Sequence, residues 1–519
     1  MINFLKKQNY LKAFNSYNDL KLKNNLNRLA ELRFFIEKNL IINNKDLFYN
    51  LFIKKILYVN YNQIFKSHLI LYILNLKFNR EFYNAYKGGV IKLSLPKNIN
   101  EIINKFGIHT SILNSFFWKL SLLKKFLKDN LAIIKLLSFK KDNILFENFI
   151  YVFNNANKIE YNNSFKSNPY SNNYAWLANK FNCKTILIPN IRNKSNYEFG
   201  QYNVFKSNNF QFNRLYKLII FLFTFLIKFI FAFFLIFTKY WHYSFMFRDI
   251  IENDCFILNS IKFDGKIFFD NNYAFERPLW TISSLINKND VHLYFVSSNF
   301  EFIQLTNKCD IQHTGYHSMQ WDNILVWDER QKNILNKFIK NPELQNIHIV
   351  GPIPYLSNLN ISNKLVNNHK QNLILFDVQP YRFTRYLEIG WPNEYYLFGN
   401  VKKFYLNILD KVDFENTNVY YKRKRETKQI DKKYLNFLNN LKIQKKISEI
   451  NCDQNIFNIF DDNKNIKVIS MPFTGPSYVA NHFGIKSSFY DPSGIIKNVN
   501  YDNLKVIKNE KDLDKFIND

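Results

Sequence analysis

The chain has 519 residues, with 71 Lys and Arg against 42 Asp and Glu, which gives a formal net charge of +29. At roughly 150 residues per domain, this length implies several domains and excludes a single small binding module. Hydrophobic residues make up 47% of the chain and aromatic residues 18%. This composition supplies a buried core and excludes a disordered polymer.

The excess of positive charge favours an anionic partner, such as nucleic acid, an anionic membrane surface or a phosphorylated substrate. Lys and Asn are both abundant, together with Ile, Phe and Tyr. AT-rich coding inflates all five residue types at once, so composition explains the charge equally well. Charge by itself therefore does not select a partner.

Two features bear on the cellular compartment. The four cysteines (Cys183, Cys255, Cys309 and Cys452) show no C-x-x-C spacing, so neither a zinc site nor a disulfide framework is indicated. The first twenty residues lack the apolar run of a secretory signal. Both features favour a reduced, cytosolic setting.

Residues 1–145 contain few Gly or Pro, and their apolar residues recur at spacings of three and four, which predicts a helical N-terminal region. The clearest stripe is Leu120, Leu123, Leu127, Leu131 and Ile134. The segment 111–139 also places Lys124, Lys128 and Lys135 on one side of a helix. Such a helix suits an anionic membrane surface, and a solvated lysine face over a core stripe explains it equally well.

The run 218–238 is apolar at every position except Thr224, Lys228 and Thr238. Its apolar residues together contribute roughly −7 kcal/mol to membrane insertion, against about +3 kcal/mol for a central lysine. A span would separate the two halves of the chain, and basic residues flank both ends. We therefore expect a monotopic or re-entrant anchor first, a single span second and a buried core helix third.

From residue 174 onward, short strands alternate with helices, which is typical of parallel, doubly wound α/β sheets. Strands are expected at 184–188, 266–270, 292–296, 324–326 and 347–350, and a second series begins at 373–378 and continues at 418–422, 447–450 and 467–470. The predicted fold class is therefore two Rossmann-like α/β domains, at 146–365 and 366–519, after the helical region. Ligands bind between such units.

The segment VISMPFTGPSYVANHFGI predicts an anion site. A buried strand ends at Ser470, small and hydroxyl residues follow, and a helix begins near Pro476. The first helical N–H groups, with Thr474, Gly475 and Ser477, would bind phosphate. The simpler interpretation is that Thr474 or Ser477 only caps the helix.

Two further motifs follow predicted strands. In YYKRKRE, alternation places Lys422 and Lys424 on one face and Arg423 and Arg425 on the other, so that one pair could reach a phosphate. A basic run is as often a solvated surface. We include Lys422, Lys424 and Arg425 among the donor-binding candidates.

In FDVQPYR, Asp377 ends a strand and Arg382 follows on the loop. Asp377 could orient a sugar or base hydroxyl group and Arg382 could pair with phosphate. The alternative is that Asp377 caps the next turn.

Sugar transfer needs a general base beside the acceptor, and three residues after strands of the earlier unit qualify by type. These are Glu276 and Asp270 first, and His317 next. Lone histidines are more often structural. A Walker loop, a G-x-S-x-G elbow, an H-E-x-x-H motif and a G-x-G-x-x-G fingerprint are all missing from the sequence, so the corresponding chemistries lose support.

Together these motifs resemble the bacterial polysaccharide-biosynthesis proteins named for a Pro-Phe-Thr-Ser motif. The resemblance covers about 174–493 and rests on ERPLW (276–280), VWDERQ (326–331), VGPI (350–353), FDVQPYR (376–382), YKRKRE (421–426), ISMPFTGPS (469–477) and YDP (490–492). The chain departs from the naming motif, because Gly475 and Pro476 separate Thr474 from Ser477.

The resemblance implies a two-domain glycosyltransferase of the GT-B kind, without a cofactor or metal. Its expected partners are a nucleotide-sugar donor, a glycan or lipid-linked glycan acceptor and the cytoplasmic face of the inner membrane, and nucleic acid is not among them. The expected activity is sugar transfer to a growing surface or capsular polysaccharide. An inactive membrane-associated assembly factor, and a basic nucleic-acid-binding protein, are the alternatives.

Overall fold

A computed structural model gives the fold of the chain. It describes residues 113–139, 149–153, 173–189, 197–199, 202–207, 210–238, 240–259, 265–274, 277–282, 290–297, 319–339, 345–354, 365, 369–380, 395, 397–423, 430–452, 454–461, 465–494, 496 and 504–519, with 97 and 101.

The C-terminal lobe is a six-stranded parallel sheet. Its strands are β11 (Gln371–Phe376), β12 (Thr417–Lys422), β13 (Ser448–Ile450), β14 (Ile466–Ser470), β15 (Lys486–Tyr490) and β16 (Val506–Ile507). They lie side by side in the order β13-β12-β11-β14-β15-β16. Counted along the chain this is 3-2-1-4-5-6, the order of a doubly wound dinucleotide-binding sheet. The chain reverses its winding direction between β11 and β14.

Helices cover both faces of this sheet because alternate strand residues are apolar on each side. One face packs against α15 (Phe398–Leu409), α16 (Lys432–Ile443) and α19 (Glu510–Asn518), with Leu373 and Leu375 of β11 in that core. The other packs against α17 (Ile456–Asp461) and α18 (Gly475–His482), with Ile374 and Phe376.

The N-terminal lobe is an eight-stranded sheet. Its strands are β2 (Phe149–Phe153), β3 (Thr185–Pro189), β4 (Tyr197–Phe199), β5 (Tyr202–Ser207), β7 (Gly265–Asp270), β8 (Val291–Tyr294), β9 (Asn323–Val326) and β10 (Asn346–Ile349). The order is β10-β9-β8-β7-β2-β3-β5-β4, and β4 pairs antiparallel with β5 while the other pairs are parallel. Helices α8 (Asn173–Lys180) and α13 (Glu329–Phe338) accompany the sheet.

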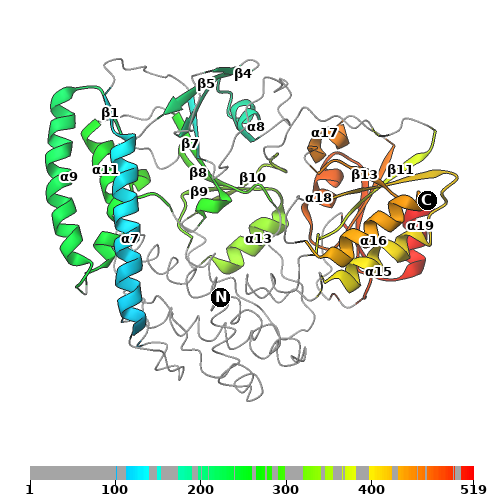
Figure 1. The fold of residues 1–519 in the computed structure, drawn as a ribbon. Coiled ribbons are helices and arrows are strands. Elements are labelled where there is room, and N and C mark those ends of the chain that lie inside the picture. Colours follow the sequence, from blue (N-terminus) through cyan, green and yellow to red (C-terminus); the bar gives the residue numbers. More distant parts are fainter. Residues whose placement is uncertain are drawn as a thin grey trace.

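A helical unit lies beside the N-terminal lobe, on the side away from the C-terminal lobe (Figure 1). It consists of α7 (Leu113–Leu136), α9 (Leu215–Leu235), α10 (His242–Phe245) and α11 (Phe247–Asn259), with a short parallel pair β1 (Ser138–Phe139) and β6 (Gln211–Phe212). Its core is aromatic, and Phe126 of α7 stacks on Phe229 of α9 with ring centroids 5.1 Å apart.

The two lobes meet at the carboxyl edge of the larger sheet. Gly475, at the start of α18, lies beside the ring of Trp327, which follows β9. Gly351, just after β10, lies against the His482 ring at the end of α18. One hydrophobic cluster contains residues of both sheets, including Leu325 and Ile374. The strand ends of the N-terminal lobe therefore face the second lobe.

The two parallel sheets with helices confirm the predicted fold class. The N-terminal region is confirmed as helical over α7, while most of 1–112 lies outside the described residues. The expectation that 1–145 is helical throughout is wrong at Ser138–Phe139, because this segment pairs with Gln211–Phe212. The buried-core interpretation of 218–238 is also wrong, since only 11% of the most apolar stretch of α9 is buried.

Candidate functional site

The candidate site lies at the point where the C-terminal sheet reverses its winding. The ends of β11 and β14 are neighbours there, because Phe376 pairs with Ser470. On the other side of β11, Leu375 pairs with Tyr421, so β12 ends at the same level at Lys422. Adjacent strands lie about 4.8 Å apart. Three motifs far apart in the sequence are therefore brought to one edge, which is where open α/β sheets bind ligands.

The loop from β14 to α18 carries the anion-site candidates Thr474 and Gly475. Phe473 has a φ of 64°, a left-handed conformation that a bulky residue rarely adopts. Its ring is buried and packs on Phe489 with centroids 5.8 Å apart, which holds the turn. Thr474 Oγ1 donates a hydrogen bond of 2.9 Å to the Met471 carbonyl oxygen.

This turn determines how α18 begins. Thr474 is the N-cap residue, in an extended conformation, and its side chain makes no hydrogen bond to the helix. Pro476 occupies the first turn, where its missing N–H costs nothing. The interpretation that the Thr474 hydroxyl caps α18 is thus wrong. The first N–H groups of the helix remain the predicted phosphate donors.

Ser477 has a different environment from Thr474. It is fully buried, and its hydroxyl bonds with that of Ser470 and reaches the Ser488 carbonyl oxygen at 3.1 Å. These contacts tie α18 to β14 and β15. Direct donor contact by Ser477 stays a prediction, and the observed role of its side chain is to hold the helix against the sheet.

The basic motif after β12 is described up to Arg423. Lys422 is buried, and its Nζ donates a hydrogen bond of 2.6 Å to the Cys452 carbonyl oxygen, just after β13. Arg423 points elsewhere, and its Nε lies 2.6 Å from Oε1 of Glu449. The two neighbouring side chains thus have different partners, and their alternation of faces stays a prediction. Lys424 and Arg425 lie outside the described residues.

Asp377 follows β11 and is turned toward the helices α15 and α16. Its Oδ2 accepts hydrogen bonds of 2.9 Å from the Tyr405 hydroxyl and 2.7 Å from the Tyr434 hydroxyl. Burial raises the pKa of Asp377 to about 6, and the two tyrosine hydrogen bonds act in the opposite direction. Asp377 therefore anchors two helices to the end of β11, and its contact with a donor stays a prediction. Arg382 lies outside the described residues.

Asp270 is the one described member of the three base candidates. It ends β7, next to β2, where the N-terminal sheet also reverses its winding. Its carboxylate accepts hydrogen bonds from the Asn272 backbone N–H at 3.0 Å and the Asn272 side-chain amide at 2.9 Å. It lies two strands from β9, or about 10 Å along the sheet edge that faces α18. Glu276 and His317 lie outside the described residues.

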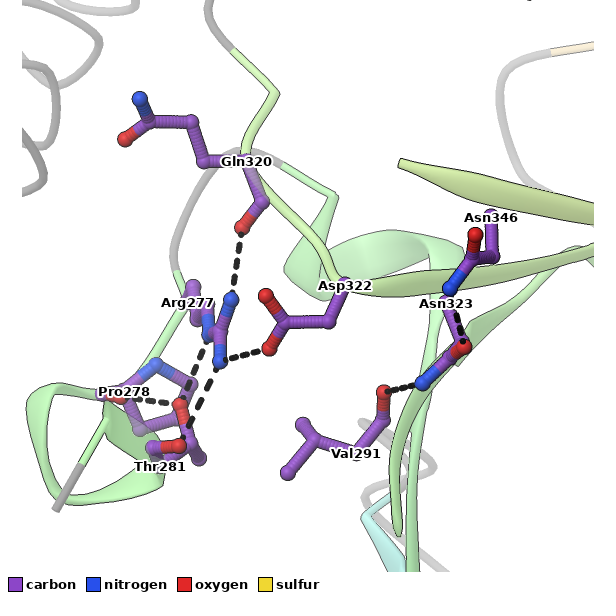
Figure 2. A network of polar contacts seen from close by, with 8 residues as sticks. All are labelled: Arg277, Pro278, Thr281, Val291, Gln320, Asp322, Asn323 and Asn346. Atoms are coloured by element: carbon purple, nitrogen blue, oxygen red, sulfur yellow. Dashed lines mark hydrogen bonds and ion pairs between the residues drawn. The ribbon is translucent and has the colours of Figure 1, made fainter. Parts of the chain in front are cut away.

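Arg277, in the ERPLW motif, is a buried structural anchor (Figure 2). Its Nε donates to the Thr281 hydroxyl at 2.9 Å, its Nη1 to the Gln320 carbonyl oxygen at 3.3 Å, and its Nη2 lies 2.6 Å from Oδ2 of Asp322. This network ties the short 3₁₀ helix Leu279–Ile282 to the segment that enters β9.

The sequence interpretation missed a cross-lobe contact between Arg330 and Tyr478. The Arg330 guanidinium carbon, on α13, lies 4.4 Å from the centroid of the Tyr478 ring, on α18. Asp328 caps α13 by accepting a 2.7 Å hydrogen bond from the Gln331 N–H, so this helix begins beside the same boundary. Arg330 belongs to the VWDERQ motif, which begins at the last residue of β9. The position of this motif at the end of a strand is the sequence signal that could have indicated Arg330 as a residue at the lobe boundary.

His292 is a buried histidine that the sequence interpretation did not select. Its ring stacks on Phe268 at 4.9 Å, and neither ring nitrogen has a hydrogen-bond partner among the described residues. Burial lowers its pKa to about 3, with smaller contributions from Lys266 and His348. His292 is therefore a neutral core residue and a poor general base.

Two observations concern other ligand sites. A surface cavity is lined by Leu406, Leu409 and Leu441, at the C-terminal ends of α15 and α16. These helix ends lie at the amino edge of the sheet, opposite the candidate site. Within the described part of the chain, groups of three or more His, Cys, Asp or Glu residues that could hold a metal ion were not found.

The fold and the site define a protein of two parallel-sheet α/β lobes, with a helix amino terminus at the switch point of the second lobe. The family model described as polysaccharide biosynthesis PFTS motif protein matches residues 225–517. This match covers more than half of the chain, and the chain belongs to that family. The predicted family is thereby confirmed. Among curated proteins, none matches.

Solved structures show a weaker likeness. The apo structure of OtsA matches with a TM-score of 0.38 and 10% identity, over 72% of this chain and 90% of that chain. An alpha,alpha-trehalose 6-phosphate synthase from Burkholderia multivorans has a TM-score of 0.36 and 7% identity, over 72% and 89%. UGT71G1 of Medicago truncatula, complexed with UDP-glucose, has a TM-score of 0.34 and 10% identity, again over 72% and 89%. The assignment rests on the family match and the observed sheet topology.

Proposed function

We propose that the protein is a glycosyltransferase that moves a sugar from a nucleotide-sugar donor to a growing surface or capsular polysaccharide. The observation that carries this proposal is the position of the family's naming motif. Residues 472–474 lie in the turn between β14 and α18, and residues 475–477 begin α18, at the switch point of a sheet with the order 3-2-1-4-5-6. That position matches where doubly wound sheets hold nucleotide phosphates.

The proposed reaction is displacement at the anomeric carbon of the donor sugar. An acceptor hydroxyl oxygen forms the new bond to that carbon, and the bond from the carbon to the phosphate oxygen breaks. The nucleotide leaves with the electron pair, and a general base takes the hydroxyl proton. The N–H groups that begin α18, at Gly475 and beyond, would stabilise the charge on the departing phosphate.

Each candidate residue has a proposed role. Glu276, Asp270 and His317 are the base candidates from the N-terminal lobe. Thr474 is proposed to shape the phosphate turn, and Lys422, Lys424, Arg425 and Arg382 are the proposed sources of positive charge for the donor phosphates. Helix dipole and cations together could neutralise the leaving group, so the proposed mechanism uses no metal or other cofactor.

The proposed acceptor is a glycan or a lipid-linked glycan at the cytoplasmic face of the inner membrane. Support comes from α9, which is long and apolar enough to cross a membrane by length and composition. Because this helix is mostly exposed, a membrane surface is the environment that suits it best. Nucleic acid is not among the proposed partners.

A donor screen tests this proposal. The purified chain is incubated with cytidine-, uridine- and guanosine-linked sugars, and nucleotide release is measured. We expect release from one nucleotide class, and a fall of at least tenfold in Thr474→Ala and in Lys424→Ala. Thr474→Ser, which keeps the hydroxyl, and Lys432→Ala, an exposed lysine on α16, are the matched controls.

Two results would contradict the proposal. Folded protein that releases nucleotide from none of the donors, with or without acceptor glycan, would favour an inactive assembly factor. Tight, salt-sensitive binding of DNA or RNA in a filter assay would favour a nucleic-acid-binding protein.

A further inference from the structure

The helical unit has an apolar surface that it leaves exposed. On α7 this surface is the stripe Phe116, Leu120, Leu127, Leu131 and Ile134, each between 44% and 58% exposed. On α9 it includes Ile219, Phe223, Leu226, Ile227, Ile230 and Phe234, each between 49% and 67% exposed. We call these residues the α7/α9 face. The residues that pack inward, such as Phe126 and Phe221, lie on other sides of the same helices.

The exposed stripes of the two helices adjoin. On α7, Phe126 stacks on Phe229 of α9, and Lys119 Nζ donates a hydrogen bond of 3.2 Å to the Phe237 carbonyl oxygen. Trp118 lies about 80° from Phe126 around the helix, on the side away from the exposed stripe, and packs against Phe245 of α10. In the opposite direction around α7 from Phe126, the next side chains are those of the exposed stripe, which therefore lies on the side of α7 nearer to α9. The α7/α9 face is therefore one surface across two neighbouring helices.

Charge is arranged around this face in a regular way. The two charged residues of α9 are Lys217 and Lys228, and Lys228 pairs with Asp254 of α11, away from the face. On α7, Lys124, Lys128 and Lys135 are exposed along the far border of the stripe. An apolar surface bordered by lysines complements an anionic lipid interface, where apolar residues enter the acyl boundary and lysines reach the phosphates.

The packing of α11 argues against a span by α9. Phe247 of α11 lies against Phe229, and Asp254 reaches Lys228 near the middle of α9. α11 also carries Asp249 and Glu252. A bilayer crossed by α9 would bring this helix and its carboxylates to hydrocarbon depth, which is strongly unfavourable. The chain before and after α9 also stays within the unit, since Phe212 pairs in β6 and the Ser244 hydroxyl donates to the Ala232 carbonyl oxygen.

We propose that the α7/α9 face docks on an anionic lipid bilayer, with α7 and α9 lying in the plane of the interface. This inference specifies the membrane association that forms part of the proposed function. The unit lies on the far side of the N-terminal lobe from α18 (Figure 1), so a docked protein keeps the lobe boundary away from the lipid.

Vesicle binding by the full chain tests the proposal. Vesicles of phosphatidylglycerol and phosphatidylethanolamine are expected to bind the protein at least tenfold more tightly than vesicles of phosphatidylcholine. Alkaline carbonate is expected to release the bound protein. Equal binding to both vesicle types would overturn the anionic requirement, and resistance to carbonate would overturn docking in the plane in favour of a span.

Variants locate the docking surface. Phe223→Glu with Ile227→Glu, and separately Lys124→Glu with Lys128→Glu and Lys135→Glu, are each expected to weaken binding at least tenfold. The matched controls are Ile443→Glu, at a 78% exposed position on α16, and Lys402→Glu with Lys403→Glu and Lys432→Glu. Normal binding by the first two variants would overturn the assignment.

Light scattering tests whether a second copy of the chain, and not a bilayer, binds the α7/α9 face. A wild-type dimer that becomes monomeric in Phe223→Glu, without vesicle binding by either form, would assign the face to a second copy of the chain. Vesicle binding is measured without a donor, so its failure leaves the sugar-transfer proposal intact, and failure of donor turnover leaves the docking surface intact.

Discussion

The edge of the C-terminal sheet buries polar side chains, whereas the helical unit exposes large apolar side chains. At the sheet edge, polar groups are buried and engaged: Asp377 by Tyr405 and Tyr434, Ser477 by Ser470, and Asp491 by Tyr395. In the helical unit, large apolar groups are exposed over the length of α9. Buried polar groups without partners and exposed apolar patches are both unfavourable in water. At the sheet edge the buried polar groups have partners within the protein, whereas the apolar side chains of the helical unit are exposed, which is why we propose that a bilayer covers them.

The largest expected effect is on the free energy of unfolding, and it distinguishes buried from exposed side chains of the helical unit. Phe126 is fully buried, so Phe126→Ala is expected to lower the free energy of unfolding by about 3–5 kcal/mol. Phe223 is 67% exposed, and Phe223→Ala is expected to change it by less than about 0.5 kcal/mol. Urea unfolding in solution compares the two. Similar losses in both would mean that Phe223 is covered in the folded protein.

A second prediction concerns the Arg277 network, a closed polar cluster of the N-terminal lobe. The Arg277 side chain is 4% exposed and that of Asp322 24% exposed. Arg277→Ala removes the donors of four acceptor atoms, on Thr281, Gln320 and Asp322, with an expected loss of about 2–4 kcal/mol in the free energy of unfolding. A double-mutant cycle with Asp322→Ala measures the coupling of the pair. Additive effects would show that the ion pair contributes no stability of its own.

The third prediction is a pH dependence from Asp377. The pKa of this buried carboxyl is about 6 in the folded protein, against an ordinary value of 3.8. The folded state thus binds the proton more tightly, so the contribution of Asp377 to stability is greatest below the ordinary pKa and is lost as pH rises through 6. The change is about 2 kcal/mol between pH 4 and pH 7.5.

Asp377→Asn isolates this contribution, because the amide keeps the shape of the side chain without titrating in this range. The difference in unfolding free energy between wild type and Asp377→Asn should move in favour of wild type as pH falls from 7.5 to 4. A difference that stays constant over this range would contradict the raised pKa. Other carboxylates titrate in both proteins and cancel in the comparison.

The C-terminal lobe could be predicted closely from the sequence, because its strands are short apolar runs that end at small or polar residues. The predicted strand 467–470 and helix after Pro476 correspond to Ile466–Ser470 and Gly475–His482. The side of the sheet toward which Asp377 points could also be predicted. Leu373, Leu375 and Asp377 alternate onto one face, and that face packs on α15 and α16.

Two features could not be predicted for physical reasons. α7 has two apolar stripes, and the sequence gives no way to choose which is buried: the helix buries Trp118, Leu122 and Phe126 and exposes the leucine stripe. The strand β2 (FIYVF) lies between Asn148 and Asn154, which mark its ends, but its place at the centre of the larger sheet comes from pairing with β3 and β7. Both depend on contacts between distant segments.

The central claim is that the phosphates of a nucleotide donor bind the N–H groups that begin α18. Hydrogen exchange by mass spectrometry, with and without the donor that supports turnover, tests it most directly on peptides covering 471–480. The account predicts slower amide exchange at 474–478 on donor binding, and no such change in a donor-binding-deficient Thr474→Ala protein. Unchanged exchange at 474–478, while donor slows exchange elsewhere in the described residues, would contradict it.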